Sequence, residues 1–240
     1  MNEDNLSNVF WKKYFKVYDV LNIVSPYNEL LNIILEKANI QKNDIVLDAG
    51  AGTCNLSVKI ITLGAITYAL DYSKDGLYMC KQKNPKIKIV YHDLEQNLPF
   101  QDNFFDKVIS NNAVYLLSTN SRLNTIREFH RVLKPGGLIV LSNVHTDFKP
   151  LQIYKEHIKK YNRNNGFILT ITQILQFIPP TIKMFYYNKK IKSSHDGHNK
   201  TTFLKHNEQK TLLEMGGFNN ISENISVYAD QAILNSGNKL

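Results

Sequence analysis

The sequence predicts a single α/β domain built on a doubly wound, mostly parallel sheet. Three apolar runs end at or just before an aspartate: 45–47 at Asp48, 65–70 at Asp71 and 87–91 before Asp93. A glycine turn and an amphipathic segment follow the first run. The carboxyl ends of parallel strands meet at one edge of a sheet. The three carboxylates are therefore expected along the edge where such folds bind ligands.

Gly50 and Gly52 form the turn after the first predicted strand, and residues 56–61 begin a helix behind it. Glycine permits the dihedral angles of such a turn and lets the backbone approach a ligand closely. Nucleotide-binding βαβ units have this turn, with an acid about 20 residues later that accepts the ribose hydroxyls. Asp71 holds that position. A tight turn without a ligand is the alternative.

Composition agrees with one domain, because 240 residues can bury one sizeable core. Cys54 and Cys80 are the only cysteines, so no disulfide framework is expected, and a reducing compartment is the default. The first residues lack a signal-peptide pattern. The apolar region 167–182 contains polar residues and Pro179-Pro180, where we expect its helix to stop, and it is too short to span a bilayer. We predict a cytoplasmic protein.

Basic residues concentrate in one part of the chain. Twelve basic and four acidic residues lie between Thr146 and Lys210, so this segment carries the whole net charge of +8. Aromatic residues are interspersed among them. The pattern indicates an acidic or lipophilic substrate, or an anionic surface such as a membrane. A solvated, lysine-rich face is the alternative.

Two further motifs follow the glycine turn. Residues 98–110 lead into a fourth apolar strand and residues 133–140 into a fifth. With these motifs, the region from about Asp44 to Asn143 resembles the class I S-adenosylmethionine-dependent methyltransferases of the small-molecule type. One departure is Cys54, where that family usually has a third glycine.

The resemblance implies a Rossmann-like, seven-stranded sheet with a C-terminal antiparallel hairpin and a helical substrate cap. Ser25-Pro26 is a typical helix start, with Ser25 as N-cap. We expect one methyltransferase domain in four parts: an N-terminal helical lid (1–40), a cofactor-binding core (41–145), a basic aromatic cap (146–206), and a last helix with the terminal hairpin (207–240).

The resemblance also implies S-adenosyl-L-methionine as cofactor. The glycine turn would lie against its amino acid and sulfonium, and the residues after the second and third strands against its ribose and adenine. The end of the fourth strand would take the ammonium group, and a Tyr-Asp pair in the lid would meet the methionine end. The implied contacts are Tyr14, Tyr18, Asp48, Ala49, Gly50, Gly52, Asp71, Tyr72, Asp93, Leu94, Ser110 and Asn111.

Methyl transfer is an in-line displacement activated by the cofactor, so a protein base is optional. The first candidate is His145, which follows the fifth strand. His195 in the cap comes next, and Tyr115 is expected to line the pocket. Two histidines and one aspartate in the glycine-containing loop 195–198 do not predict a metal site, and no metal is expected.

Missing motifs narrow the acceptor to a small molecule. The fourth strand ends in residues 110–115 without the Asn-Pro-Pro-Tyr motif of DNA base-amine methyltransferases, and the chain has no Pro-Cys dipeptide for attack on cytosine. Nucleic acid is therefore not the expected partner. The predicted reaction is methyl transfer to an O, N or C atom of a small metabolite. The alternatives are methylation of RNA or a membrane lipid, and a non-catalytic cofactor-binding regulator or partner.

Overall fold

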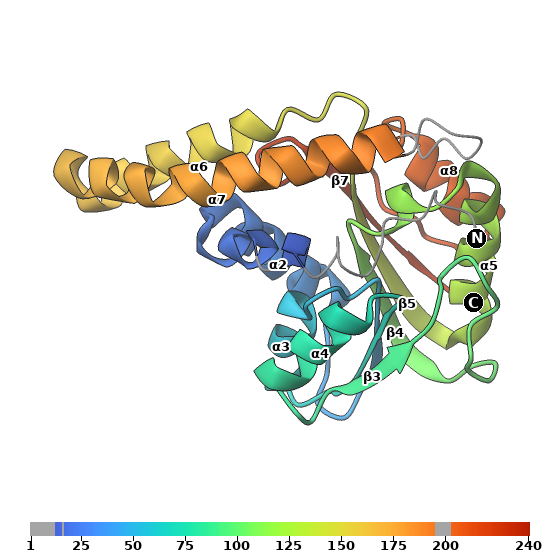
Figure 1. Cartoon of the computed structure of the whole chain (residues 1–240). Helices are drawn as coiled ribbons and strands as arrows, with labels where there is room; N and C mark the ends of the chain where they lie inside the picture. The colour runs from blue at the N-terminus through green and yellow to red at the C-terminus, as the bar shows by residue number, and fades with distance from the viewer. Residues whose placement is uncertain (1–12, 16, 195–202) are drawn as a thin grey trace.

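A seven-stranded sheet forms the centre of the protein, as a computed structural model that describes residues 13–15, 17–194 and 203–240 shows (Figure 1). Its strand order is β3-β2-β1-β4-β5-β7-β6. The first five strands are parallel, and β7 runs antiparallel to β5 and to β6. The strands are β1 (Ile45–Ala49), β2 (Ile66–Asp71), β3 (Lys88–Tyr91), β4 (Phe105–Asn111), β5 (Leu133–Val144), β6 (Ile225–Val227) and β7 (Ala232–Asn238). The predicted fold class is confirmed.

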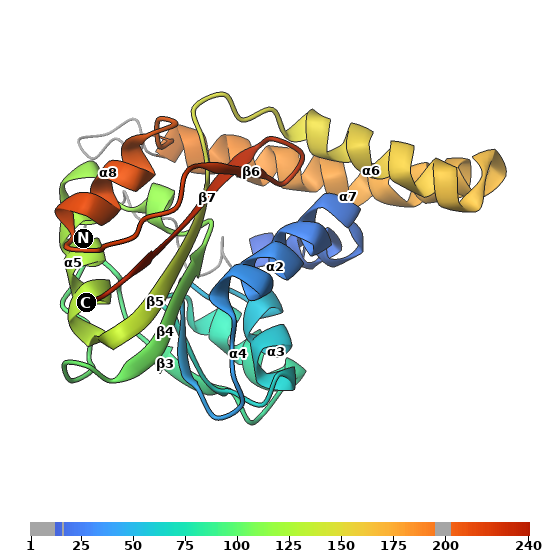
Figure 2. The same ribbon diagram turned by 180° about the vertical axis from the view of Figure 1, so that it is seen from behind.

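Helices cover both faces of this sheet (Figures 1 and 2). One face carries α2, α3 and α4, and the other carries α5 and α8. The helices are η1 (Asp19–Ile23), α2 (Ser25–Ala38), α3 (Asn55–Thr62), α4 (Lys74–Lys83), η2 (Val114–Leu116), α5 (Thr119–Val132), α6 (Pro150–Asn165), α7 (Phe167–Ser194) and α8 (Glu208–Met215).

The two core layers explain why the central strands are apolar throughout. Val46 belongs to the core beneath α2 and α3, whereas Leu47 belongs to the core beneath α5 and α8, and both side chains are fully buried. The strand order reverses between β1 and β4, with later strands on one side and earlier ones on the other. Ligands of doubly wound sheets bind outside the carboxyl ends at such a point.

Two expected helix boundaries are wrong. Val24 is the N-cap of α2, and Ser25 lies inside the helix, where its hydroxyl contacts His157 Nδ1 of α6 at 3.0 Å instead of capping. Pro179-Pro180 lie within α7 rather than at its end. A proline removes its own helix hydrogen bond, so its cost is local, and the helical backbone continues beyond it.

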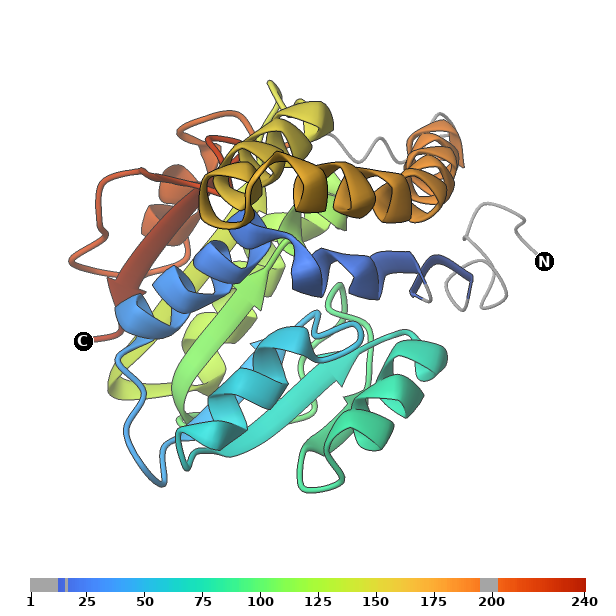
Figure 3. The same ribbon diagram turned by 90° about the vertical axis from the view of Figure 1, so that its left-hand side faces the viewer.

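The helices α6 and α7 form a hairpin that projects from the sheet past the end of α2 (Figures 1 and 3). At its base the Thr146 N–H donates to the Leu204 carbonyl at 3.1 Å, beside a bridge between His145 and Leu204. No helix within the described ranges combines the length and apolarity needed to cross a membrane.

Candidate cofactor and acceptor site

Asp71, at the carboxyl end of β2, holds the glycine turn against the sheet. One of its carboxylate oxygens accepts the Gly52 backbone N–H at 2.8 Å, and the other accepts the Ser73 N–H at 2.8 Å. Burial raises the pKa of Asp71, and the backbone N–H groups oppose this rise. The Tyr72 N–H is a third donor to this carboxylate, which leaves about one of its four lone-pair sites for a further donor. The carboxylate can therefore accept a ribose hydroxyl while it holds the turn.

Asp48 supports the turn from behind. Its buried carboxylate accepts a 2.5 Å hydrogen bond from the Ser57 hydroxyl on α3. Burial raises the pKa of Asp48 to about 7; the Asp71 charge adds to this rise, and Ser57 opposes it. Asp48 thus joins the start of α3 to the end of β1.

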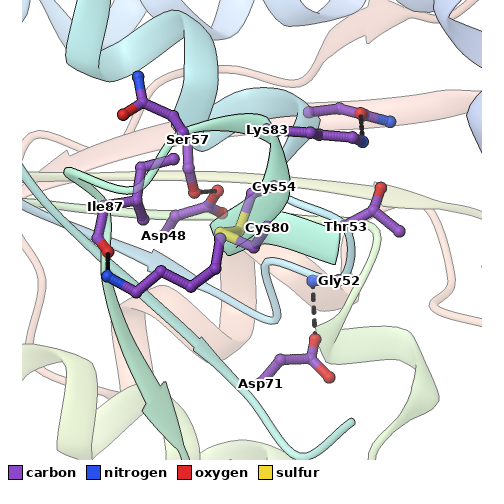
Figure 4. Close-up of a disulfide and its surroundings, with 12 residues drawn as sticks. Asp48, Gly52, Thr53, Cys54, Ser57, Asp71, Cys80, Lys83 and Ile87 are labelled. Atoms are coloured by element: carbon purple, nitrogen blue, oxygen red, sulfur yellow. Dashed lines mark hydrogen bonds between the residues drawn. A yellow bond between two sulfur atoms is a disulfide. The ribbon is translucent and has the colours of Figure 1, made fainter. Parts of the chain in front are cut away.

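A disulfide joins the glycine turn to α4 (Figure 4). Cys54 and Cys80 are both fully buried, with Cα atoms 5.1 Å apart. The expectation that the two cysteines form no disulfide is wrong. They are 26 residues apart in sequence, but β1 and β2 are neighbours, and the helices that follow them lie side by side on one face.

The backbone at Cys54 shows why glycine is the usual residue at this position. Cys54 has φ +63°, in the left-handed region that favours glycine. A cysteine is therefore strained where the resembled family usually has a third glycine. The disulfide compensates by fixing this residue to α4.

The glycine turn leaves no room for a side chain at Gly50. A Cβ at Gly50, where φ is +78°, would lie 2.3 Å from the Cβ of Ala113. The ring of Phe15 packs against Gly52, at 3.4 Å from where a Cβ would stand, and also against Gly76 on α4. Sequence analysis missed Phe15, because an aromatic residue in a lid helix gives no local signal of what it covers. The close backbone fits a cofactor that needs direct approach to Gly50 and Gly52.

The end of β4 adds an acceptor to this edge. The Asn111 side-chain oxygen is buried and finds no hydrogen-bond partner among the described residues. Ser110 is fully buried, and its hydroxyl donates to the Ala49 carbonyl at 2.8 Å. A buried acceptor without a donor is costly, and an ammonium group would satisfy it. The site therefore fits the amino acid part of S-adenosylmethionine.

The part of the site that is expected to hold the adenine is more exposed to solvent. Leu94 is buried, and its side chain approaches Gly50. Asp93 is exposed, and its carboxylate accepts the Glu95 N–H at 2.9 Å. Tyr72 is 42% exposed beside Asp71. The structure thus brings Leu94 and Tyr72 to the edge of the site and turns Asp93 toward its own loop.

The lid is bonded to the glycine turn through Asp19. Its carboxylate accepts from the Thr53 hydroxyl at 2.7 Å and from Asn55 Nδ2 at 3.2 Å, and it pairs with Lys83 of α4 at 2.9 Å. These bonds place Asp19 at the turn, and the contact of the Tyr18-Asp19 pair with the methionine end of the cofactor stays a prediction. Charge and hydrogen bonds thus hold the lid over the site.

Six tyrosines gather between the lid, the sheet and the base of the hairpin, and we call them the tyrosine cluster. Their ring centroids lie 5.5 to 6.3 Å apart along the chain of contacts from Tyr14 to Tyr18, Tyr27 and Tyr228. Burial raises the pKa of all six phenols. The cluster consists of Tyr14, Tyr18, Tyr27, Tyr115, Tyr154 and Tyr228. Sequence analysis missed Tyr27, Tyr154 and Tyr228, since they come from segments far apart in the chain.

The predicted acid-base residues are bonded within the protein or lie outside the described part. His145 Nε2 lies 3.1 Å from the Asp230 carbonyl, and its Nδ1 accepts the Asp147 N–H at 3.2 Å, so both ring nitrogens have partners. Tyr115 stacks on Phe203, with ring centroids 5.5 Å apart, and burial raises its pKa to about 12. His195 is outside the described residues. The geometry gives no support to His145 as a base.

One group of possible metal ligands occurs among the described residues, away from the loop considered in the sequence. His145, Asp147 and His206 have donor atoms within 4.8 Å of one another. Asp147 and His206 are exposed, and the two imidazole rings lie 4.3 Å apart at a tilt of 34°. Both ring nitrogens of His145 already have hydrogen-bond partners within the protein, so this group does not argue for a metal.

Known proteins resemble this chain over the same region. A family model described as a methyltransferase domain matches residues 47–141. A demethylmenaquinone methyltransferase from Staphylococcus epidermidis is 34% identical over 158 residues, which cover 58% of this chain and 64% of that protein. A malonyl-[acyl-carrier protein] O-methyltransferase from Buchnera aphidicola is 41% identical over 113 residues, or 47% of this chain and 44% of that protein. The chain therefore spans under two thirds of each of these relatives.

The fold also matches solved structures over nearly its whole length. The crystal structure of an S-adenosylmethionine-dependent methyltransferase from Aquifex aeolicus superposes with a TM-score of 0.62. The match covers 98% of this chain and all of the other, at 14% sequence identity. With the glycine turn and the strand order, these matches show that residues 47–141 form a methyltransferase domain and that the chain has the fold of the class I S-adenosylmethionine-dependent methyltransferases.

Proposed function

We propose that this chain transfers the methyl group of S-adenosylmethionine to a small, lipophilic acceptor with an aromatic ring. The tyrosine cluster carries the proposal, because six phenols, two of them buried and four half-buried, offer aromatic faces together with hydroxyl groups. A pocket of about 480 Å³ lies between the lid and α7, beside the cluster. Tyr187 lines this pocket, and its ring centroid lies 6.3 Å from that of Tyr14. The name of the Staphylococcus relative, a demethylmenaquinone methyltransferase, agrees with an acceptor of this class.

The bound cofactor would supply a methyl group activated by the sulfonium. The protein's part is to hold both partners in line and to exclude water. Asp71, the Gly50–Gly52 backbone and Asn111 would hold the cofactor, and Phe15 with the lid would cover it. Tyr115 keeps its proton at neutral pH, since its pKa is about 12. It would therefore orient the acceptor by donating a hydrogen bond rather than remove a proton.

A carboxylate acceptor is the second candidate. The basic segment from Thr146 to Lys210 favours it, since this segment holds the whole net charge of the chain. The Buchnera relative, whose name gives malonyl-[acyl-carrier protein] as its substrate, agrees with this class. Transfer assays with a quinol and with a malonyl thioester would separate the two candidates. Methylation of the thioester alone would replace our first proposal with the second.

Calorimetry with S-adenosylmethionine tests the cofactor site directly. Asp71→Asn should weaken binding about thirtyfold, because the amide replaces an acceptor by a donor and costs about 2 kcal/mol. Asp75→Asn on α4 is the matched control and should bind as the wild type does. If the Asp71 variant bound S-adenosylmethionine as tightly as the wild type, Asp71 would not be part of the cofactor site. Cofactor binding without methylation of any acceptor would favour the non-catalytic regulator.

The expected cytoplasmic location stays a prediction.

A further inference from the structure

The tip of the hairpin formed by α6 and α7 exposes large apolar side chains. Phe167 is 72% exposed, Ile168 78% and Leu169 52%, in consecutive positions at the start of α7. The tip is the part of the hairpin farthest from the sheet (Figures 1 and 2). Three adjacent apolar residues in this position contribute nothing to the core that the sheet and its helices bury.

The same hairpin is strongly basic. Residues 150–194 contain eight lysines and arginines and a single acid, Glu156. Lys160 pairs with Glu29 of α2 at 2.5 Å, whereas Lys159 comes no nearer than 3.9 Å to Glu156. Most of the positive charge therefore has no acid on the same hairpin to balance it.

A groove of about 350 Å³ runs between the two helices close to the tip. Its lining includes the apolar residues Ile158, Phe167, Ile171 and Ile174, with Lys155 and Lys159 beside them. An apolar channel next to two ammonium groups matches the two parts of an anionic lipid, its acyl chain and its phosphate.

We propose that this tip docks on the surface of an anionic lipid bilayer. Phe167, Ile168 and Leu169 would enter the boundary between headgroups and acyl chains, while Lys155, Lys159 and Arg163 contact lipid phosphates. The proposed contact is with the surface of the bilayer, at the depth of the headgroups and the first acyl carbons. A second copy of the chain fits less well, because two hairpins of the same positive charge repel each other.

Vesicle sedimentation of the full chain tests this proposal. Vesicles of phosphatidylcholine with phosphatidylglycerol should bind the protein, and binding should weaken as salt is added. Phosphatidylcholine alone should bind it poorly. Phe167→Ser with Ile168→Ser should lower the partition coefficient at least about tenfold, because each buried side chain of this size contributes 1.5 kcal/mol or more. Removing a tip charge by Arg163→Gln should lower it about fivefold.

Matched controls remove similar side chains elsewhere. Leu63→Ser with Tyr78→Ser deletes apolar groups that are 44% and 67% exposed at the end of α3 and on α4, and Lys86→Gln deletes a charge before β3. These variants should bind vesicles as the wild type does. All variants should keep the wild-type affinity for S-adenosylmethionine, which shows that they are folded.

Three results would overturn the proposal: no binding to anionic vesicles, equal loss in the tip and control variants, or a concentration-dependent dimer that the tip variants abolish. The last would identify a second copy as the partner. Vesicle binding requires neither cofactor nor acceptor. Its failure would leave the proposed methyl transfer standing, and a failed transfer assay would leave the membrane surface standing.

Discussion

The glycine turn and the helical hairpin are stabilised in opposite ways. Hydrogen bonds to Asp19, Asp48 and Asp71 hold the turn, and a disulfide fixes its end to α4. The hairpin is bonded to the core near its base and along α2, and its tip is exposed and apolar. The difference indicates that bonds within the protein fix the conformation of the turn, whereas the tip of the hairpin is available to contact something outside the protein.

Replacing one glycine by alanine in each region should give the largest difference between the two in the free energy of unfolding. Gly50→Ala should lower the free energy of unfolding by about 3 kcal/mol, because the Cβ meets Ala113 and φ is positive. Gly166→Ala, between α6 and α7, has the same kind of φ (+80°) but nothing within 4 Å of the new Cβ. It should cost about 1–2 kcal/mol, from backbone strain alone at φ +80° and ψ 171°. Denaturant titration measures both, and equal losses would contradict the comparison.

Breaking the disulfide should loosen the turn by a similar amount. Cys80→Ala should lower the free energy of unfolding by about 3 kcal/mol, the usual contribution of a disulfide that closes a loop of this length. Adding a reductant to the wild type should produce most of this loss, and adding it to the variant should change nothing. Free thiols in the purified, oxidised protein would show that the two cysteines are not paired.

Because Asp48 is buried, the free energy of unfolding should decrease as the pH rises. An unfolded Asp48 ionises near 3.8 and the folded residue near 7, so the folded state binds more protons between these values. The free energy of unfolding should therefore decrease from pH 4 to pH 7, by up to about 1.4 kcal/mol per pH unit. Asp48→Asn still accepts from Ser57 and should flatten this dependence. An unchanged slope in the variant would show that Asp48 is ionised in the folded protein.

The smallest effect is expected where the tyrosine cluster meets the acceptor. Tyr115→Phe keeps the ring that stacks on Phe203 and removes only the phenol. If this phenol orients the acceptor and takes no proton, kcat should fall by less than about tenfold, and the pH profile should keep its shape. A change in the profile near neutral pH would restore Tyr115 as a base.

Local patterns predicted the cofactor half of the molecule well. The apolar runs before Asp48 and Asp71 gave strands β1 and β2, and Gly50 gave the turn, because each depends on residues close in sequence. The predicted carboxyl-end edge followed from parallel pairing alone. The roles proposed for Asp71 and Asn111 stay predictions until binding is measured.

Contacts between distant segments were not predictable in this way. The pairing of Cys54 with Cys80 depends on which helices share a face of the sheet. The tyrosine cluster combines residues from Tyr14 to Tyr228, and no single stretch of sequence shows it. Pro179 was misjudged because helix propensity is local, whereas α7 packs on α6.

The hairpin leaves and re-enters the core at one point, where Thr146 bonds to Leu204. The part of this segment beyond its contacts with the core and with α2 can therefore vary in length and composition without moving any strand. This part can be replaced as a unit. A change of acceptor, or of the membrane surface that the hairpin contacts, therefore requires no change in the part that holds the methyl donor. We expect a chimera with the corresponding insert of a relative to keep its affinity for S-adenosylmethionine while its acceptor changes.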